Sequence, residues 1–214
     1  MYTPQFDIVT TGQAIAYLGN KYNKLNKPSG LSALPMLTIL KLLFLADRYS
    51  LRTYSKMVSN DKYYAMKKGP VASVAYNILK GDFKEVDTLT GEYKEDFDKT
   101  LGRLRNGVYP ISSLTRDDLE YLSDSDIEAL DIVFKKYGKM SEQELIKNTH
   151  NYPEWTRHKK SLEKSSSKRE EVLIKDFFEE GPKESLARDI PLEVLNARYV
   201  YFIGNVEWML QKIS

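Results

Sequence analysis

The chain has 214 residues, of which 42% are hydrophobic and 29% charged, a composition that is ordinary for a globular protein of one domain. Its 32 basic and 30 acidic residues leave a net charge of +2, which is too balanced for phosphate neutralisation to dominate any binding. The absence of cysteine excludes disulfides, thiol nucleophiles and metal sites built on cysteine ligands.

The N-terminal quarter predicts two helices. The first residues, MYTPQFDIVTTG, lack the basic start and apolar core of a signal peptide. A helix is predicted from Thr10, which forms a capping-box pair with Gln13. A second helix begins near Pro35 and runs through MLTILKLLFLADRYSL, whose apolar residues occupy nearly every side, so we expect it to be buried all round. That run is shorter than the roughly 20 apolar residues that cross a bilayer. We therefore expect a cytoplasmic protein without membrane contact.

The segment 61–81, DKYYAMKKGPVASVAYNILKG, begins like a strand and ends like a helix. KYYAMKK has the aromatic, extended character of a short strand. Gly69 predicts a turn, Pro70 predicts the start of a helix, and Gly81 predicts its end. The joint between the predicted strand and helix, Gly69-Pro70, carries no Ser, Cys or His. A role in folding therefore explains it without any chemistry.

The middle of the chain predicts a hairpin and two capped helices. An Asn-Gly pair flanked by apolar residues predicts a β-hairpin over 101–111. Ser123 with Asp126 opens one of the helices that follow, and Ser141 with Glu144 forms a capping box that opens the second, shorter one. A further turn is expected at Pro153.

The last part of the chain changes in composition. Residues 159–171, KKSLEKSSSKREE, predict a polar linker or an exposed helix end. After Pro191 a long 3-4 apolar repeat predicts a C-terminal helix that docks on the core or on a second copy of the chain. We therefore predict a mostly α (α+β) fold, a compact helical domain with a small hairpin or short-strand sheet. Its predicted division is a main domain at 1–158, the linker at 159–171 and a docked helical extension at 172–214.

Patterns of catalysis are missing. The sequence has no GxSxG elbow, no P-loop and no GxGxxG. Because His150 and His158 are the only histidines, a metal site would have to depend on carboxylates. Asp47 and Arg48 lie inside the most apolar helix, where we expect them to be buried and tied to tyrosine side chains or to loop backbone. We predict no catalytic, metal-binding or cofactor-binding residue and no enzymatic activity.

Tyrosine and lysine instead indicate a protein-binding surface. The chain has 15 tyrosines, whose apolar rings and polar tips suit partner surfaces. Two lysines beside two tyrosines form a positive patch that would meet an acidic partner. The residues predicted to contact a partner are Arg48, Tyr63, Tyr64, Lys67, Lys68 and Trp155.

Three alternatives stay open. A helix–YGKM–helix pattern over 123–150, with the basic segment 157–169, is that of a DNA-binding repressor, although its second helix begins SEQEL and would face phosphates with two carboxylates. A small hydrolase or transferase with an acid pair brought together by folding is the second alternative. A phage or mobile-element structural protein that forms homo-oligomers through the C-terminal helix is the third.

Three blocks of the sequence resemble a known family. LTILKLLFLADRYSL, DKYYAMKKGPVASVAYNILKG, and LSDSDIEALDIVFKKYGKMSEQELIKNTH with EW close behind resemble the Panacea domain. That antitoxin domain family includes the SocA-like antitoxins and the phage-associated GepA proteins. The blocks lie within residues 15–155. The resemblance places the motif of the family at positions that mainly determine the fold. These positions are Asp47, Tyr64, Ala65, Gly69, Pro70 and Val71.

The resemblance implies a mostly helical domain with a small strand component and no enzymatic activity. It implies an antitoxin of a type II toxin–antitoxin system that neutralises a cognate protein toxin, encoded by the adjacent gene, by direct binding. Some members resemble proteolytic adaptors, which hand the bound toxin to a protease. The family often has histidine at the position of Lys68, so the joint itself departs from the family pattern here.

Overall fold

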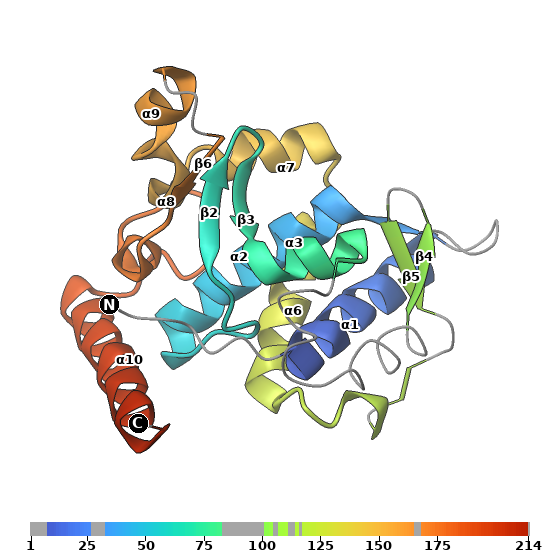
Figure 1. The fold of residues 1–214 in the computed structure, drawn as a ribbon, viewed down its shortest axis with the longest axis horizontal. Helices are drawn as coiled ribbons and strands as arrows, with labels where there is room; N and C mark the ends of the chain where they lie inside the picture. The colour runs from blue at the N-terminus through green and yellow to red at the C-terminus, as the bar shows by residue number, and fades with distance from the viewer. Residues whose placement is uncertain are drawn as a thin grey trace.

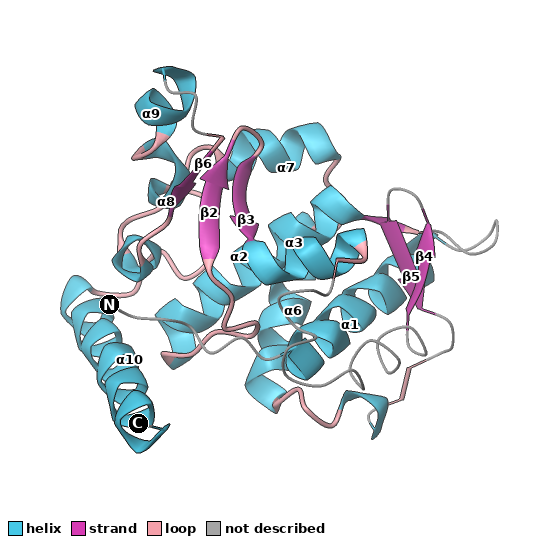
Figure 2. Cartoon of the chain, in the orientation of Figure 1, coloured by secondary structure: helices cyan, strands magenta, loops and turns pink. Residues whose placement is uncertain are grey.

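Helices dominate the fold, and two small sheets lie on opposite sides of them (Figures 1 and 2). The computed structural model describes residues 8–26, 33–82, 101–104, 107–110, 114–115, 117–164 and 168–213. Each sheet has three antiparallel strands. The prediction of a mostly α (α+β) fold is confirmed.

The helix α2 (Met36–Tyr54) forms the centre of the molecule, and every residue of its run 38–48 is buried. It contacts five helices, two strands and a 3-10 turn. Since a buried leucine, isoleucine or phenylalanine contributes about 1.5–3 kcal/mol, the apolar side chains of this helix contribute strongly to core stability. The expectation of a helix buried all round is confirmed.

The other described helices surround α2. They are α1 (Ile8–Asn26), α3 (Ser73–Lys80), α6 (Asp124–Tyr137), α7 (Glu142–Thr149), α8 (Pro153–Thr156), α9 (Lys159–Lys164) and α10 (Leu192–Ile213), with the 3-10 turns η1 (Asp117–Leu119) and η2 (Ile174–Phe178). Helices α1, α3, α6, α7 and α10 all contact α2 directly.

The first sheet has the order β1-β5-β4 and lies against α1. Its strands are β1 (Leu34–Pro35), β4 (Leu101–Leu104) and β5 (Gly107–Pro110). Leu104 pairs with Gly107, so the predicted hairpin is confirmed. The asparagine of its turn signal, Asn106, lies outside the described residues.

The second sheet corrects one prediction. Its strands β2 (Tyr63–Met66), β3 (Gly69–Ala72) and β6 (Arg169–Glu171) have the order β3-β2-β6. Pro70 pairs with Ala65 in the ladder, and α3 begins only at Ser73, so the predicted helix start at Pro70 is wrong. Proline is tolerated here because β3 is an edge strand, where a missing backbone donor costs little.

Local signals placed several other helix ends correctly, but not the start of α1. Both capping boxes are present at Ser123 and Ser141. Helix α3 ends at Gly81, which has a φ of +81°. The capping box predicted at Thr10 is wrong, because α1 begins at Ile8. The Gln13 side chain instead accepts a hydrogen bond of 3.0 Å from a backbone N–H after η1, and so holds α1 to that loop.

The chain after residue 168 contributes to the same hydrophobic core as α2. Strand β6 pairs with β2, whereas α9 has no buried residue. Phe177 of η2 is fully buried, and its ring lies 5.7 Å from that of Phe44 in α2. Leu195 and Phe202 bury one side of α10, while three of its apolar side chains, Leu192, Val200 and Tyr201, are more than 60% exposed. The division of the chain at 158 and 171 stays a prediction. Homo-oligomer formation through α10 also stays a prediction.

Candidate functional site

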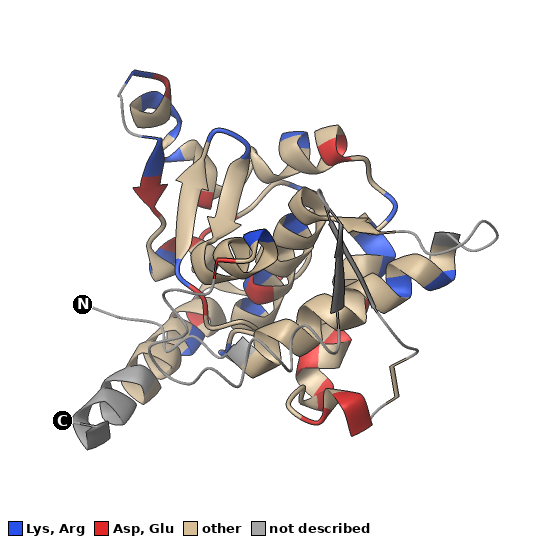
Figure 3. Cartoon of the chain, turned by 45° about the vertical axis from the view of Figure 1, so that its right-hand side comes forward, with Lys and Arg blue, Asp and Glu red and all other residues tan. Residues whose placement is uncertain are grey.

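The turn between β2 and β3, formed by Lys67 and Lys68 and called here the hairpin tip, projects at the rim of the molecule. Both lysines are exposed, and the turn is a blue loop in Figure 3. Beside it, the half-buried ring of Tyr64 lies 4.8 Å from the Arg169 guanidinium and 5.7 Å from the Lys62 ammonium. The hairpin tip therefore carries two exposed positive charges, whereas Lys62 beside Tyr64 is ion-paired with Glu171 of β6.

A buried lysine supports the hairpin from below. Lys41 of α2 donates a hydrogen bond of 2.8 Å to the backbone oxygen of Pro70, and burial lowers the pKa of its amine to about 7. Gly69 has a φ of +101°, which side chains other than hydrogen rarely allow. A Cβ at this position would lie 2.7 Å from the Lys41 Nζ and 2.8 Å from the Thr149 Oγ1. The glycine is thus required by both backbone and neighbours.

We expect Gly69→Ala to lower the free energy of unfolding by about 2–3 kcal/mol, through backbone strain and overpacking. Chemical denaturation monitored by circular dichroism measures the change. Gly204→Ala in α10 is the matched control, because no atom lies within 4 Å of its added Cβ and alanine favours a helix. Equal stability of the two variants would contradict the proposed requirement for glycine.

Asp47 joins α2 to the loop that leads into the hairpin. It is fully buried and accepts hydrogen bonds from the backbone N–H of Val58 at 2.7 Å, the backbone N–H of Ser59 at 2.9 Å and the Tyr63 hydroxyl at 2.6 Å. The Ser59 hydroxyl is a further donor. Burial raises the pKa of this carboxyl to about 6, although the hydrogen bonds from Ser59 and Tyr63 oppose that rise. The expected ties to tyrosine and loop backbone are present.

Asp61 performs the capping of α3 from outside the helix. It is fully buried, and its carboxylate accepts from the backbone N–H groups of Val74 at 3.1 Å and Ala75 at 2.8 Å. The residue before the helix, Ala72, offers no side-chain cap. Burial raises the pKa of Asp61 to about 7, against the effect of the same backbone donors. Both buried acids around the hairpin thus serve the fold.

Two arginines of α2 bind the chain that follows β6. Arg48 forms an ion pair with Glu154 of α8 and donates 2.6 Å to the backbone oxygen of Glu179. Arg52 donates to four backbone oxygens, those of Phe177 (3.3 Å), Phe178 (2.8 Å), Glu179 (2.9 Å) and Ala187 (3.1 Å). Burial and the nearby charge of Arg48 lower the pKa of Arg52 to about 10, so it stays cationic at neutral pH. These bonds fasten residues 176–187 to the central helix.

The residues predicted to contact a partner are therefore divided between interior and surface. Arg48 and Tyr63 are each only 2% exposed, so their bonds are internal. Lys67 and Lys68 are exposed, and Tyr64 is half-buried. Of the motif positions, Asp47, Ala65, Gly69, Pro70 and Val71 are buried, in agreement with a folding role.

Trp155 connects the hairpin to α7. Its indole Nε1 donates 2.9 Å to the backbone oxygen of Met66, the residue before the hairpin tip. Its ring is stacked on that of His150, with centroids 3.7 Å apart and an angle of 7° between the planes. Burial of the imidazole, and then the positive charges of Lys41 and Lys159, lower the pKa of His150. Both effects favour the neutral form of the imidazole in the stack.

Sequence reasoning did not find Lys41, Asp61, Arg52 or the His150 stack. The one local signal near the stack was Pro153, which begins α8 four residues after α7 ends at Thr149. Within the described part of the chain, no three His, Asp or Glu side chains are grouped to hold a metal ion. Among the described helices, none is both long and apolar enough to cross a membrane.

The geometry also bears on the repressor alternative. Helix α7 would be the reading helix, yet its first turn carries Glu142 and Glu144, and both side chains are exposed. A helix that enters the major groove with its first turn would place these carboxylates against phosphates. The exposed charges at this helix start therefore count against DNA reading.

Comparison with known proteins identifies the fold's family. The family described as antitoxin SocA-like, Panacea domain, matches residues 39–156, which is more than half of the chain. The match runs from α2 to α8 and includes the hairpin, α6 and α7. Neither the curated proteins nor the solved structures contain a match. The chain belongs to the SocA-like Panacea domain family.

Proposed function

We propose that this protein is the antitoxin of a type II toxin–antitoxin system, which neutralises a cognate protein toxin by binding it and catalyses no reaction. The Panacea match over residues 39–156 is the observation that carries the proposal. The buried acids support it, because Asp47 and Asp61 accept their hydrogen bonds from the chain itself. Their chemistry is thus committed to the fold.

A rigid surface supports binding as the mode of action. The hairpin is held by Lys41 from below and by the Trp155 indole from the side. A surface that is already ordered loses little conformational entropy when a partner docks, so more of the contact energy remains for affinity. The exposed hairpin tip is the part of this surface that carries free charge.

The test uses the toxin that we propose is encoded by the adjacent gene. Expression of that gene alone is expected to stop growth, and co-expression of this protein is expected to restore growth and to yield a complex on affinity purification. A catalytically inactive toxin variant provides the control for expression level. A soluble, active toxin that does not bind this protein at micromolar concentration would refute the proposal. If the protein is a proteolytic adaptor, the toxin's half-life in cells will shorten when it is present.

A further inference from the structure

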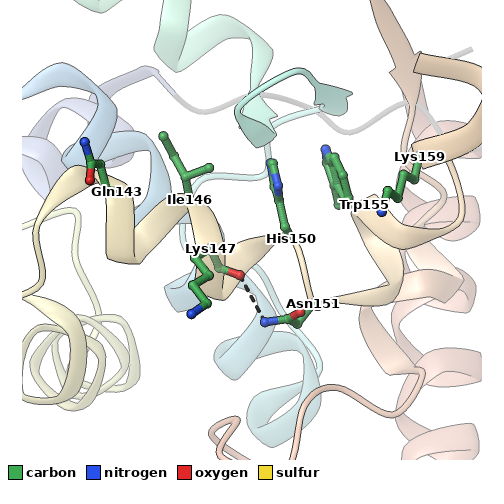
Figure 4. A pocket seen from close by; sticks show the side chains of 7 residues that line it. All are labelled: Gln143, Ile146, Lys147, His150, Asn151, Trp155 and Lys159. Atoms are coloured by element: carbon green, nitrogen blue, oxygen red, sulfur yellow. Dashed lines mark hydrogen bonds between the residues drawn. The ribbon is translucent and has the colours of Figure 1, made fainter. Parts of the chain in front are cut away.

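A shallow groove of about 450 Å³ lies where α7 ends and α8 and α9 begin. The apolar part of its lining is formed by Ile146 and by the rings of His150 and Trp155, and two lysines, Lys147 and Lys159, stand beside them (Figure 4). No carboxylate side chain is among the residues that line it. The groove therefore combines an aromatic floor with a positively charged rim.

Two hydrogen bonds hold the residues that line the groove. The His150–Trp155 stack is fixed to the hairpin by the indole bond to Met66. Beside the stack, Asn151 Nδ2 donates 3.0 Å to the backbone oxygen of Lys147, the dashed line in Figure 4. A side chain of a binding partner would thus enter a surface that is already formed. Binding hot spots in protein interfaces have this arrangement.

The charged residues that line the groove, Lys147 and Lys159, are both positive. Among the described residues, the ammonium groups of Lys67, Lys68 and Lys147 form no ion pair, whereas Lys159 lies 4.0 Å from Glu163. The hairpin tip adjoins the groove, because Trp155 bonds to the residue directly before it and the Lys67 backbone faces His150. Unpaired ammonium groups next to an apolar floor attract an acidic partner.

We propose that this groove receives an acidic segment of the toxin, with one apolar side chain on the His150–Trp155 stack and carboxylates at Lys147 and the hairpin tip. This inference rests on the proposed function, and it specifies which surface and which partner chemistry perform it. A protein segment is favoured over nucleic acid, because phosphate-driven binding needs many neutralising cations. The net charge of the chain is only +2, and Glu142 and Glu144 are exposed on the same helix as Lys147.

The experiment measures binding of the full-length protein to the purified toxin of the adjacent gene by isothermal titration calorimetry at several salt concentrations. The variants are Lys147→Glu alone and Lys68→Glu with Lys147→Glu, both at exposed positions. We expect Kd to rise about tenfold or more in the double variant, with a smaller dependence of Kd on salt, because attractive charges have become repulsive. Circular dichroism confirms that the variants are folded.

Lys135→Glu is the matched control. Lys135 lies in the last turn of α6 as Lys147 lies in the last turn of α7, so both changes remove the same favourable charge from a helix end. We expect the control to leave Kd unchanged.

If wild type and all variants bind the toxin equally, the groove proposal is overturned and the proposed function stands. If wild type does not bind the toxin at all, the proposed function fails and the groove proposal with it. Duplex DNA and single-stranded RNA are tested in parallel, and a gel shift that Lys147→Glu abolishes would also overturn the assignment to a protein segment.

Discussion

Arg52→Leu is expected to lower the free energy of unfolding by about 4 kcal/mol and to loosen residues 177–187 from α2. Arg52 is 1% exposed, and its guanidinium donates hydrogen bonds to four backbone oxygens of that segment. A hydrogen bond to a charged group contributes about 1.5–3 kcal/mol to stability. The change to leucine removes such a bond from each of the buried carbonyl groups. Because the four bonds share one side chain, their contributions to stability are not additive, and the expected loss is smaller than their sum. Chemical denaturation measures the stability, and hydrogen exchange locates the loosened segment.

The control for this change is Arg188→Leu. Arg188 pairs with Glu180 at the surface, where the glutamate side chain is 70% exposed. Surface ion pairs contribute about 0–1 kcal/mol, so this variant should remain close to wild type. Arg52→Lys adds a second comparison, since an ammonium keeps the charge but cannot place donors on four oxygens at once. Wild-type exchange rates in residues 177–187 of the Arg52→Leu protein would refute the account of Arg52.

Asp47→Ala is expected to lower the free energy of unfolding by a similar amount, about 4 kcal/mol. The change removes one acceptor from the backbone N–H groups of Val58 and Ser59 and from the Tyr63 hydroxyl, all at sites that are buried. Each buried donor without a partner costs about 1–3 kcal/mol. Because these groups connect α2 to β2, the loop 57–61 should lose its order together with the hairpin. Thermal and chemical denaturation measure the loss.

Tyr63→Phe is the matched control for Asp47. It removes one hydrogen bond and leaves the carboxylate with its donors from Val58 and Ser59, so we expect a loss of about 1 kcal/mol. Asp47→Asn keeps the size of the side chain but turns an amide N–H₂ toward groups that also donate. Its free energy of unfolding should therefore be closer to that of Asp47→Ala than to that of wild type. A stable, well-folded Asp47→Ala protein would show that the network is dispensable.

The parts of the fold that could be predicted from sequence are those set by local signals. The apolar run of α2 has no polar side, and so burial on every side was the only stable arrangement. The capping boxes at Ser123 and Ser141 act within one helical turn, which is why both were found. The order of Gly69 and Pro70 fits a helix start as well as a strand, and the choice between them depends on Ala65 across the ladder and on Lys41 below it.

The candidate site was less predictable because its groups come from distant parts of the chain. Lys67 and Lys68 were expected at the surface and lie there. Arg48 was expected to meet a partner, but Glu154 and the backbone of Glu179, more than a hundred residues away, bind it inside the protein. The polar residues of an apolar helix carry no local sign of which distant group will meet them. The partner-contacting residues stay a prediction.

The order of the second sheet has a consequence for self-association. Both outer strands are poor templates for another chain, because β3 lacks one backbone donor at Pro70 and β6 is three residues long and fully charged, with Arg169, Glu170 and Glu171. Natural sheets use proline, charge and short outer strands to prevent edge-to-edge aggregation. The edges of this sheet are thereby protected against fibril-like stacking even when the surface is free of any partner.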